Sequence, residues 1–330
     1  MWRRCPGPAL LITTALALAA AGCSGSGATQ AVAGARPATP AVTRSRPGTR
    51  PSPRTSARTG AARPGTGSSS RTSRAVAGRH SGGGVCTSAA HPGLAARISR
   101  GIASALRGRL SVAAVAAGDP ALGLSCRLHP WREFHSASVV KVIILGALLR
   151  ELQAEHEDLT ARQAGLATAM ITESSNAAAT ALWDEVGQAG LGAFLAAAGM
   201  SRTELGPGGY WGLTEVNAHD EMLLLRLLMA PNGVLDRWSR GYALRLMAAV
   251  IPAQCWGVPA GSAAGVTAHL KNGWLPDPSL WVVNSIGDFT RARGGDYSIA
   301  ILTMDNPDMD YGVATVQAVA TVINRALADA

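Results

Sequence analysis

Lysine is almost absent from this 330-residue chain: of its 30 lysine and arginine residues, only Lys141 and Lys271 are lysines. Arginine stays protonated in proteins, whereas a lysine ammonium can lose its proton where it is buried. A site that needs a proton acceptor can therefore use lysine but not arginine. The alternative is chance, because most exposed charges are solvated and carry no function. The residues around the two lysines decide between these interpretations.

Acidic residues are missing from residues 1–84, although the whole chain contains 21. Arg3 and Arg4 precede an apolar run over residues 9–21, which is too short to span a bilayer as a helix and is typical of an export signal. The segment AAGC at 20–23 resembles a bacterial lipobox, which predicts lipidation of Cys23, and ordinary signal cleavage is the alternative. We therefore expect an exported protein, either anchored at the outer face of the cell membrane through Cys23 or secreted.

Residues 24–84 contain no aromatic residue and consist mainly of Gly, Ser, Thr, Ala, Pro and Arg. Such a stretch cannot bury enough apolar surface to offset the entropy of ordering, so the sequence predicts a disordered tether. The tether carries ten arginines and no acid, whereas residues 85–330 carry 18 basic and 21 acidic residues. The net charge of +9 therefore belongs to the signal and tether, and we expect no nucleic-acid binding. The tether's charge favours anionic membrane or wall polymers, or the tether is only a soluble spacer.

Cysteine is scarce, and the motifs CxxC and HExxH do not occur. Cys86, Cys126 and Cys255 lie in the region expected to fold, so at most one disulfide can form among them. We expect Cys86 to pair with Cys126, because one helix and one hairpin turn separate them. The seven histidines are scattered, and we expect neither a metal nor another cofactor.

Hydrophobic periodicity divides residues 85–330 into helical and extended segments. The expected elements are a helix at 91–108, two strands within 109–130, a helical block at 136–250, strands at 266–274, 280–289 and 296–304, and a helix at 313–330. Hairpin-length connections predict an α/β domain with a five-stranded antiparallel sheet, flanked by the N- and C-terminal helices, plus an all-helical lobe. We expect a monomer whose functional site lies in the crevice between the two lobes.

The first lysine follows a serine by three residues, at the start of an apolar helix expected over residues 139–153. Ser138 and Lys141 would share one face of that helix. The helix is apolar nearly all round, as a buried central helix would be. Partial burial lowers the pKa of a lysine, so Lys141 could accept the Ser138 proton and activate a nucleophile. The helix N-terminus also supplies N–H groups where an oxyanion would form.

Three motifs together make the chain resemble a known family. They are Ser138-Val139-Val140-Lys141, Ser174-Ser175-Asn176 and Lys271-Asn272-Gly273. These are similar to the SxxK, SxN and KTG motifs of class A β-lactamases and penicillin-binding D,D-peptidases, and they occur in the family's order on helix, helix and strand. Both lysines of the chain fall within them. Taken singly, the SxN serine could be a helix-interior residue that bonds back to a carbonyl, and the Asn-Gly pair could be a hairpin turn.

The resemblance implies a β-lactamase/transpeptidase-like fold and a serine hydrolase that works through an acyl-enzyme. It makes Ser138 the nucleophile and Lys141 its base. Ser174 would relay a proton to the leaving nitrogen, helped by Lys271. The oxyanion would lie between the N–H groups of Ser138 and Trp274. The residues that the resemblance assigns to substrate binding are Asn176, Asn272, Gly273 and Trp274.

Two departures from the family's pattern affect its implications. Asn272 stands where the family has a hydroxyl residue that helps to bind a substrate carboxylate. Residues 199–221 lie where class A enzymes have an omega loop with a glutamate that activates the deacylating water. In this chain Arg202-Thr203-Glu204 is similar to the start of that loop, but the stretch that follows it is short and Gly-rich and lacks the companion asparagine. Glu204 and Glu215 are its only carboxylates before Asp220, and either could be the deacylation base.

These features leave three functions open. The first is a serine hydrolase that opens β-lactam amide bonds, with slow deacylation. The second is a D,D-peptidase, amidase or esterase that acts on cell-wall peptides and is inhibited by β-lactams. The third is a tethered lipoprotein that binds wall fragments with little turnover. The complete set of Ser138, Lys141, Ser174 and Lys271 argues against the third function.

Overall fold

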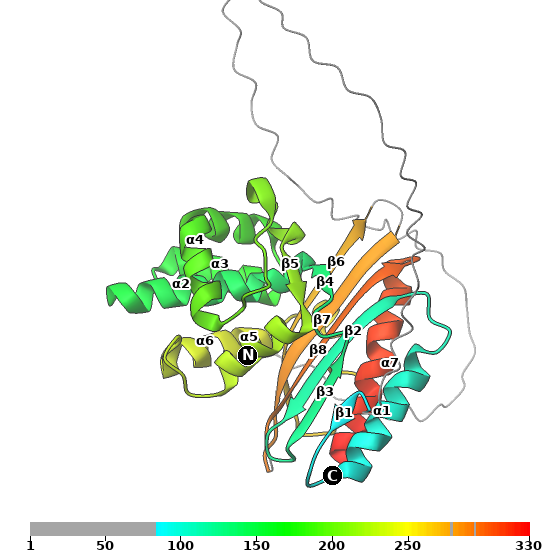
Figure 1. Cartoon of the computed structure of the whole chain (residues 1–330). Coiled ribbons are helices and arrows are strands. Elements are labelled where there is room, and N and C mark those ends of the chain that lie inside the picture. Colours follow the sequence, from blue (N-terminus) through cyan, green and yellow to red (C-terminus); the bar gives the residue numbers. More distant parts are fainter. Residues whose placement is uncertain (1–83, 278–279, 294) are drawn as a thin grey trace, which may run out of the picture. The chain divides into compact units, whose positions relative to one another are not determined.

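The computed structural model describes residues 84–277, 280–293 and 295–330 (Figure 1). The predicted export signal (1–23) and the tether up to residue 83 lie outside the described residues, so both stay predictions. Within the described part of the chain, none of the helices is both long and apolar enough to cross a membrane.

Helices and strands follow one another in the predicted order. The strands are β1 (Cys86–Thr87), β2 (Val112–Asp119), β3 (Leu124–Leu128), β4 (Glu133–His135), β5 (Glu215–Asn217), β6 (Thr267–Asp277), β7 (Leu280–Thr290) and β8 (Tyr297–Asn306). The α-helices are α1 (Pro92–Leu106), α2 (Val140–Glu155), α3 (Ala161–Thr172), α4 (Asn176–Ala198), α5 (Ala218–Met229), α6 (Arg237–Ala248) and α7 (Met309–Ala328). Short 3-10 turns are η1 (Ala137–Val139), η2 (Pro207–Gly209), η3 (Trp211–Leu213) and η4 (Pro252–Gln254).

The main sheet has six strands in the spatial order β1-β3-β2-β8-β7-β6, paired antiparallel. The five strands expected from the sequence are β2, β3, β6, β7 and β8. Strand β1 is an addition to the prediction, because two residues are too few to show a strand periodicity. Strands β4 and β5 were not predicted either. They form a separate two-stranded sheet, and β5 lies inside the region expected to be helical.

The first strand is held by the predicted disulfide. Cys86 and Cys126 lie opposite each other in the β1–β3 register and are disulfide-bonded. The Cys86 N–H also donates to the Ser99 hydroxyl of α1 at 2.8 Å. The start of the folded region is thereby fixed both to the sheet and to the first helix.

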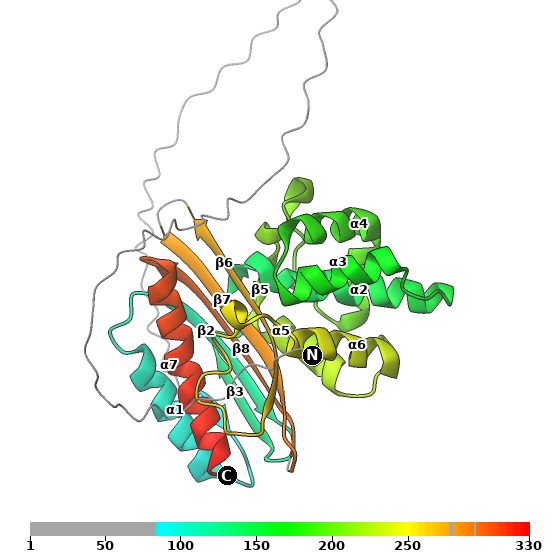
Figure 2. The same ribbon diagram turned by 180° about the vertical axis from the view of Figure 1, so that it is seen from behind.

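The sheet separates two hydrophobic cores. Helices α1 and α7 cover one face, and α2–α6 form the helical lobe on the other side (Figures 1 and 2). In β8, Ile299 and Ile301 pack in the core beside α1 and α7, whereas Ala300 and Leu302 pack in the core of the helical lobe. Because successive side chains of a strand point to opposite faces, a strand covered on both sides is apolar throughout.

Helix α2 is the central helix of the helical lobe. Eleven of its sixteen residues are buried, which agrees with the helix being apolar nearly all round. Its N-terminal end continues from η1, which contacts β6 and β7 of the sheet. The start of α2 therefore lies where the helical lobe meets the sheet.

Candidate active site

The SxxK motif spans the 3-10 turn η1 and the start of α2, at the junction of the lobes. Ser138 lies in η1, and Lys141 lies in the first turn of α2. Ser138 is partly exposed, whereas the Lys141 side chain is completely buried, at 0% exposure. A substrate can thus reach the serine, while the lysine stays out of water.

The Lys141 amine lies among oxygen atoms of the SxN motif. Its Nζ donates to the Ser174 carbonyl oxygen at 2.7 Å and to Asn176 Oδ1 at 2.8 Å, and it lies 3.1 Å from Ser174 Oγ. Burial, together with the charge of Lys271, lowers the pKa of Lys141 to about 6. The amine is therefore mostly neutral at pH 7. A neutral amine has two N–H groups for the two obligate acceptors and one lone pair left for a hydroxyl proton.

Ser174 joins the two lysines of the chain. Lys271 Nζ donates to Ser174 Oγ at 2.9 Å, so the hydroxyl lies within hydrogen-bonding distance of both amines. Burial lowers the pKa of Lys271 to about 7. Ser174 itself lies between α3 and α4 and not inside a helix, which rules out a helix-interior serine bonding back to its own helix. The contacts form a continuous path for a proton from Lys271 through Ser174 to Lys141.

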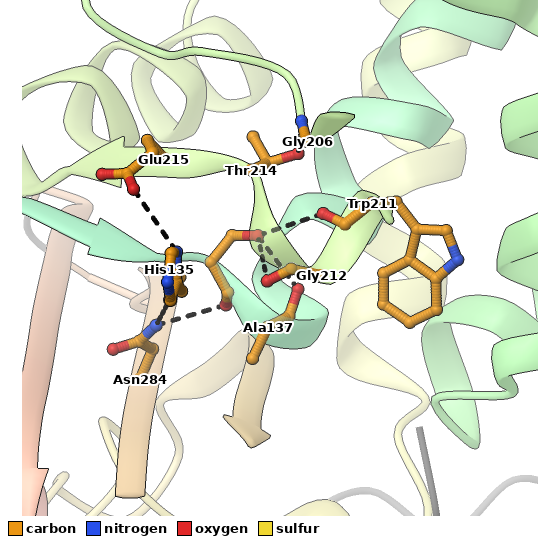
Figure 3. Close-up of polar contacts among 9 residues, drawn as sticks. His135, Ala137, Gly206, Trp211, Gly212, Thr214, Glu215 and Asn284 are labelled. Carbon is orange, nitrogen blue, oxygen red and sulfur yellow. Dashed lines mark hydrogen bonds and ion pairs between the residues drawn. The ribbon is translucent and has the colours of Figure 1, made fainter. Parts of the chain in front are cut away.

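Two residues of the site have a positive φ, a left-handed backbone conformation that is unfavourable for residues other than glycine. Ala137, directly before the candidate nucleophile, has φ 49°, and Ser174 has φ 59°. Each such residue costs about 1–3 kcal/mol and persists only where surrounding contacts fix it. Asn284 Nδ2 donates to the carbonyl oxygens of His135 at 2.9 Å and Ser136 at 3.2 Å, which anchors the segment before Ser138 to β7 (Figure 3).

Gly273 allows β6 to pass directly beside Ser138. A Cβ at this position would lie 2.7 Å from the Ser138 backbone nitrogen and 2.8 Å from the Ser136 carbonyl oxygen, so only glycine fits. The strand β6 runs through Asn272 and Gly273 without interruption, which rules out a hairpin turn there. The Trp274 ring packs against Trp256 at a centroid distance of 5.7 Å, on the face of the sheet that α1 and α7 cover.

The structure places the Asn272 side chain away from the two lysines. Its Nδ2 donates to the carbonyl oxygens of Gln254 at 2.8 Å and Trp256 at 3.0 Å, and its Oδ1 accepts from the Ser285 hydroxyl at 2.6 Å. Neighbouring side chains of a strand point to opposite faces, so Asn272 and Lys271 diverge. Asn272 holds the end of η4 and Trp256 to the sheet, and its contact with a substrate stays a prediction.

Of the two carboxylates expected to serve deacylation, one is exposed and the other lies beside His135. Glu204 is exposed, and its backbone pairs with that of Glu215. The Glu215 carboxylate lies 3.5 Å from His135 Nδ1 in the β4–β5 sheet (Figure 3). Among the described residues, no carboxylate pairs with the Lys141 amine. The amine also has an aromatic neighbour: Nζ lies 4.7 Å from the ring centroid of Trp211.

Sequence reasoning missed Trp211 and Asn284 as parts of the site. Trp211 is in the Gly-rich segment that replaces the expected omega loop, and Asn284 is a polar residue within an apolar strand. A buried polar residue in a central strand needs partners, which is the signal that could have marked Asn284. Trp211 has no comparable local signal. Within the described residues, no group of three His, Cys, Asp or Glu side chains could hold a metal ion.

Sequence comparison identifies a family. The family described as "Beta-lactamase enzyme family" matches residues 159–327, which is slightly more than half of the chain. The match includes the Ser174 and Lys271 motifs and begins after Lys141. None of the curated proteins matches the chain.

Solved structures show the same fold at low sequence identity. A class A β-lactamase from Bacteroides cellulosilyticus is 16% identical with a TM-score of 0.63, over 71% of this chain and 98% of that chain. The structure of PBP-A is 20% identical with a TM-score of 0.62, over 71% of this chain and 97% of that chain. A β-lactamase from Sphaerobacter thermophilus is 19% identical with a TM-score of 0.61, over 71% of this chain and 98% of that chain. With the fold of class A β-lactamases and a family match over half its length, the chain belongs to the β-lactamase enzyme family and is a serine hydrolase that acts on amide bonds.

Proposed function

We propose that the protein forms an acyl-enzyme at Ser138 with β-lactams and related amides, and that it releases the acyl group slowly. One observation carries the proposal. The Lys141 amine contacts Ser174, Asn176 and the Trp211 ring, and no described carboxylate pairs with it. Lys141, Ser174 and Asn176, which the proposal uses for acylation, are thus together, and none of the described carboxylates pairs with the amine.

Acylation uses the contacts of the two lysines. The neutral Lys141 takes the Ser138 proton, and the serine oxygen attacks the substrate carbonyl. The developing oxyanion lies at the N-terminal end of α2, beside β6. The C–N bond then breaks, and the leaving nitrogen takes the Ser174 proton, which Lys271 or Lys141 replaces. The serine ester and a free amine remain, so no proton is gained or lost overall.

Deacylation needs a different group. Water is a weak nucleophile and must lose a proton to a positioned base as it attacks the serine ester. Glu204 and Glu215 lie elsewhere, and general-base assistance typically accelerates a reaction by about 10²–10⁴-fold. An enzyme without this assistance accumulates the acyl-enzyme.

A cell-wall peptide is the second candidate substrate, and the position of β6 favours it. The strand β6 lies at the edge of the main sheet and passes beside Ser138 at Gly273. An edge strand has unpaired backbone groups, with which an extended peptide can pair. One solved structure of a PBP-A mutant is an acyl-enzyme complex with penicillin G, which shows that this fold can hold such an adduct in that protein. A D,D-peptidase would use the same Ser138 acylation and be trapped by β-lactams.

The test follows the adduct directly. The purified protein is mixed with a labelled penicillin, and intact mass is recorded over time, with Ser138→Ala as the control. We expect an adduct that forms quickly, decays slowly and is absent from the control. Rapid decay would instead mean an efficient β-lactamase. An unmodified wild-type protein would contradict the proposal and support a wall-binding protein with little turnover.

Membrane attachment is a separate proposal that rests on the sequence alone. We propose that Cys23 is lipidated after export and holds a monomeric enzyme at the outer face of the membrane. Metabolic labelling with a fatty acid, in wild type and in Cys23→Ser, tests it. Label in both proteins, or in neither, would contradict the proposal.

A further inference from the structure

The Trp211 ring occupies a fixed place beside the Lys141 amine. Its centroid lies 4.7 Å from Nζ, and its Nε1 donates to Thr180 Oγ1 of α4 at 3.1 Å. This hydrogen bond sets the orientation of the ring, while the other partners of Nζ belong to Ser174 and Asn176. The lysine is therefore enclosed by oxygen acceptors and one aromatic face.

The backbone of the same segment is tied to the residues that precede the nucleophile. The Ser136 N–H donates to the Thr214 carbonyl oxygen at 2.8 Å, and Ser136 Oγ lies within 3.5 Å of the Trp211 carbonyl oxygen and 3.4 Å of that of Gly212. The Thr214 hydroxyl accepts from the Gly206 N–H at 3.1 Å, which closes the loop. Figure 3 shows the Trp211 ring on the side of its backbone away from the position of His135. Trp211 is thus held at two places: its indole nitrogen contacts Thr180, and its backbone contacts Ser136.

A ring face and a carboxylate differ in what they do to a lysine base. A carboxylate within about 4–6 Å favours the charged lysine strongly, and typically shifts a neighbouring pKa by about 1–3 units. A base in that state is already protonated before the reaction. An aromatic face attracts an ammonium more weakly through its quadrupole and leaves the neutral amine available. It also has no lone pair with which to take a proton from water.

We propose that Trp211 is a positioning residue for Lys141: its ring keeps the amine dry at rest and stabilises the ammonium that forms when the amine takes the Ser138 proton. This inference rests on the proposed acylation of Ser138. It accounts for a site that can acylate without a neighbouring carboxylate. The same ring fills one side of the amine with a group that cannot activate water, which agrees with slow release.

The charged surroundings of Lys141 are simple enough for a pH experiment. The charged group that affects the pKa of Lys141 is Lys271 on β6. Burial lowers this pKa, and the positive charge of Lys271 lowers it further. The junction of α3 and α4 contributes the neutral Ser174 and Asn176, and η3 contributes Trp211. The rate of acylation should rise with pH as Lys141 loses its proton, with a midpoint near its pKa of about 6.

The test changes the ring's electron density without changing its size. In the full-length protein, Trp211 is replaced site-specifically by monofluorinated and trifluorinated tryptophan. The rate constant for adduct formation with a labelled penicillin is then measured as a function of pH. The same substitutions at Trp238, an exposed residue of α6 at 52% exposure, are the matched control. Thermal unfolding confirms that each variant is folded.

Fluorination withdraws charge from the ring face, so the ammonium form of Lys141 loses stabilisation and its pKa falls. We expect the midpoint of the pH profile to move stepwise to lower pH, by roughly half a pH unit for the trifluorinated ring, with no shift for Trp238. A midpoint that stays constant at position 211, while the wild type still acylates, would overturn the role of Trp211 alone. A wild-type protein that never acylates would overturn the proposed function instead.

Discussion

The two lysines of the chain and the two glutamates considered for deacylation lie in opposite environments. Lys141 and Lys271 come from elements 130 residues apart, yet both are buried and both contact the Ser174 hydroxyl. Glu204 and Glu215 lie within a dozen residues of each other and face solvent or His135. The two lysines therefore differ from the two glutamates in being buried and in sharing a hydrogen-bond partner.

A third pattern occurs at Glu221, whose carboxyl group is buried but unpartnered. Both of its oxygens lack a hydrogen-bond partner among the described residues, and burial raises its pKa to about 8. Burial alone therefore does not distinguish a catalytic group. The lysines differ from Glu221 in having hydrogen-bond partners, and they share one of them, the Ser174 hydroxyl. The following variants test this distinction, from the largest expected effect to the smallest.

Lys141→Arg removes the proton acceptor while keeping the positive charge. Because a guanidinium stays protonated, we expect acylation of Ser138 by a labelled penicillin to fall by about 10⁴-fold. Rapid-quench mass spectrometry measures the rate. Arg150→Lys, at a half-buried position on the same helix, is the control and should acylate normally. Acylation of Lys141→Arg at the wild-type rate would contradict the assignment of Lys141 as the base.

Ser174→Ala removes the hydroxyl that contacts both amines. We expect about a 10³-fold loss of acylation, because the leaving nitrogen no longer receives a proton through Ser174. Ser175→Ala is the matched control, since Ser175 caps α4 by accepting from the Ala178 N–H and should cost only about 1 kcal/mol of stability. Equal losses in the two variants would mean that stability, and not proton transfer, explains the effect.

Gly273→Ala tests how closely β6 must approach the nucleophile. Its Cβ would lie 2.7 Å from the Ser138 nitrogen, so the strand or η1 must shift. We expect about a 10²-fold slower acylation and a loss of about 1–3 kcal/mol of stability. Gly192→Ala, where a Cβ has nothing within 4 Å, should instead stabilise α4 by about 0.5–1 kcal/mol. Unchanged kinetics in Gly273→Ala would show that the approach is not required.

Glu221→Leu tests the buried carboxyl group that has no partner. The pKa of Glu221 is raised from 4.5 to about 8, so between these pH values the folded protein holds a proton that the unfolded chain has lost. Wild-type stability should therefore fall as pH rises, by about 1.4 kcal/mol per pH unit from this group. The leucine variant lacks this slope, and its advantage in urea denaturation should grow from pH 5 to pH 8. A constant difference would mean that Glu221 does not titrate in this window.

Glu204→Gln and Glu215→Gln should have the smallest effect. Neither carboxylate contacts the site, so the decay of the acyl-enzyme should match that of the wild type in both variants. Intact mass over several hours measures the decay. A 10²-fold slower decay in either variant would identify that residue as a general base and would contradict the proposed deacylation without a carboxylate base.

Much of the fold follows from local sequence patterns. The five long strands, the terminal helices and the Cys86–Cys126 pair could be predicted because periodicity and chain connectivity are local properties. The strands β1, β4 and β5 could not, since segments of two or three residues carry no periodicity and form only where a partner strand is available. The left-handed backbone conformation of Ser174, between α3 and α4, could not be predicted either, because it depends on how these two helices pack.

The candidate site likewise has features that the sequence predicts and features that it does not. The sequence alone determined which residues could do the chemistry: two lysines in an arginine-rich chain, each within a motif, and a serine three residues before the first. Only the tertiary structure decided which side chains meet. It turned Asn272 away from the lysines, left Glu204 and Glu215 at a distance, and brought Trp211 to Lys141. The reason is physical: residue type fixes what a group can donate or accept, whereas burial and distance, which set its pKa and its partners, arise only when distant segments pack together.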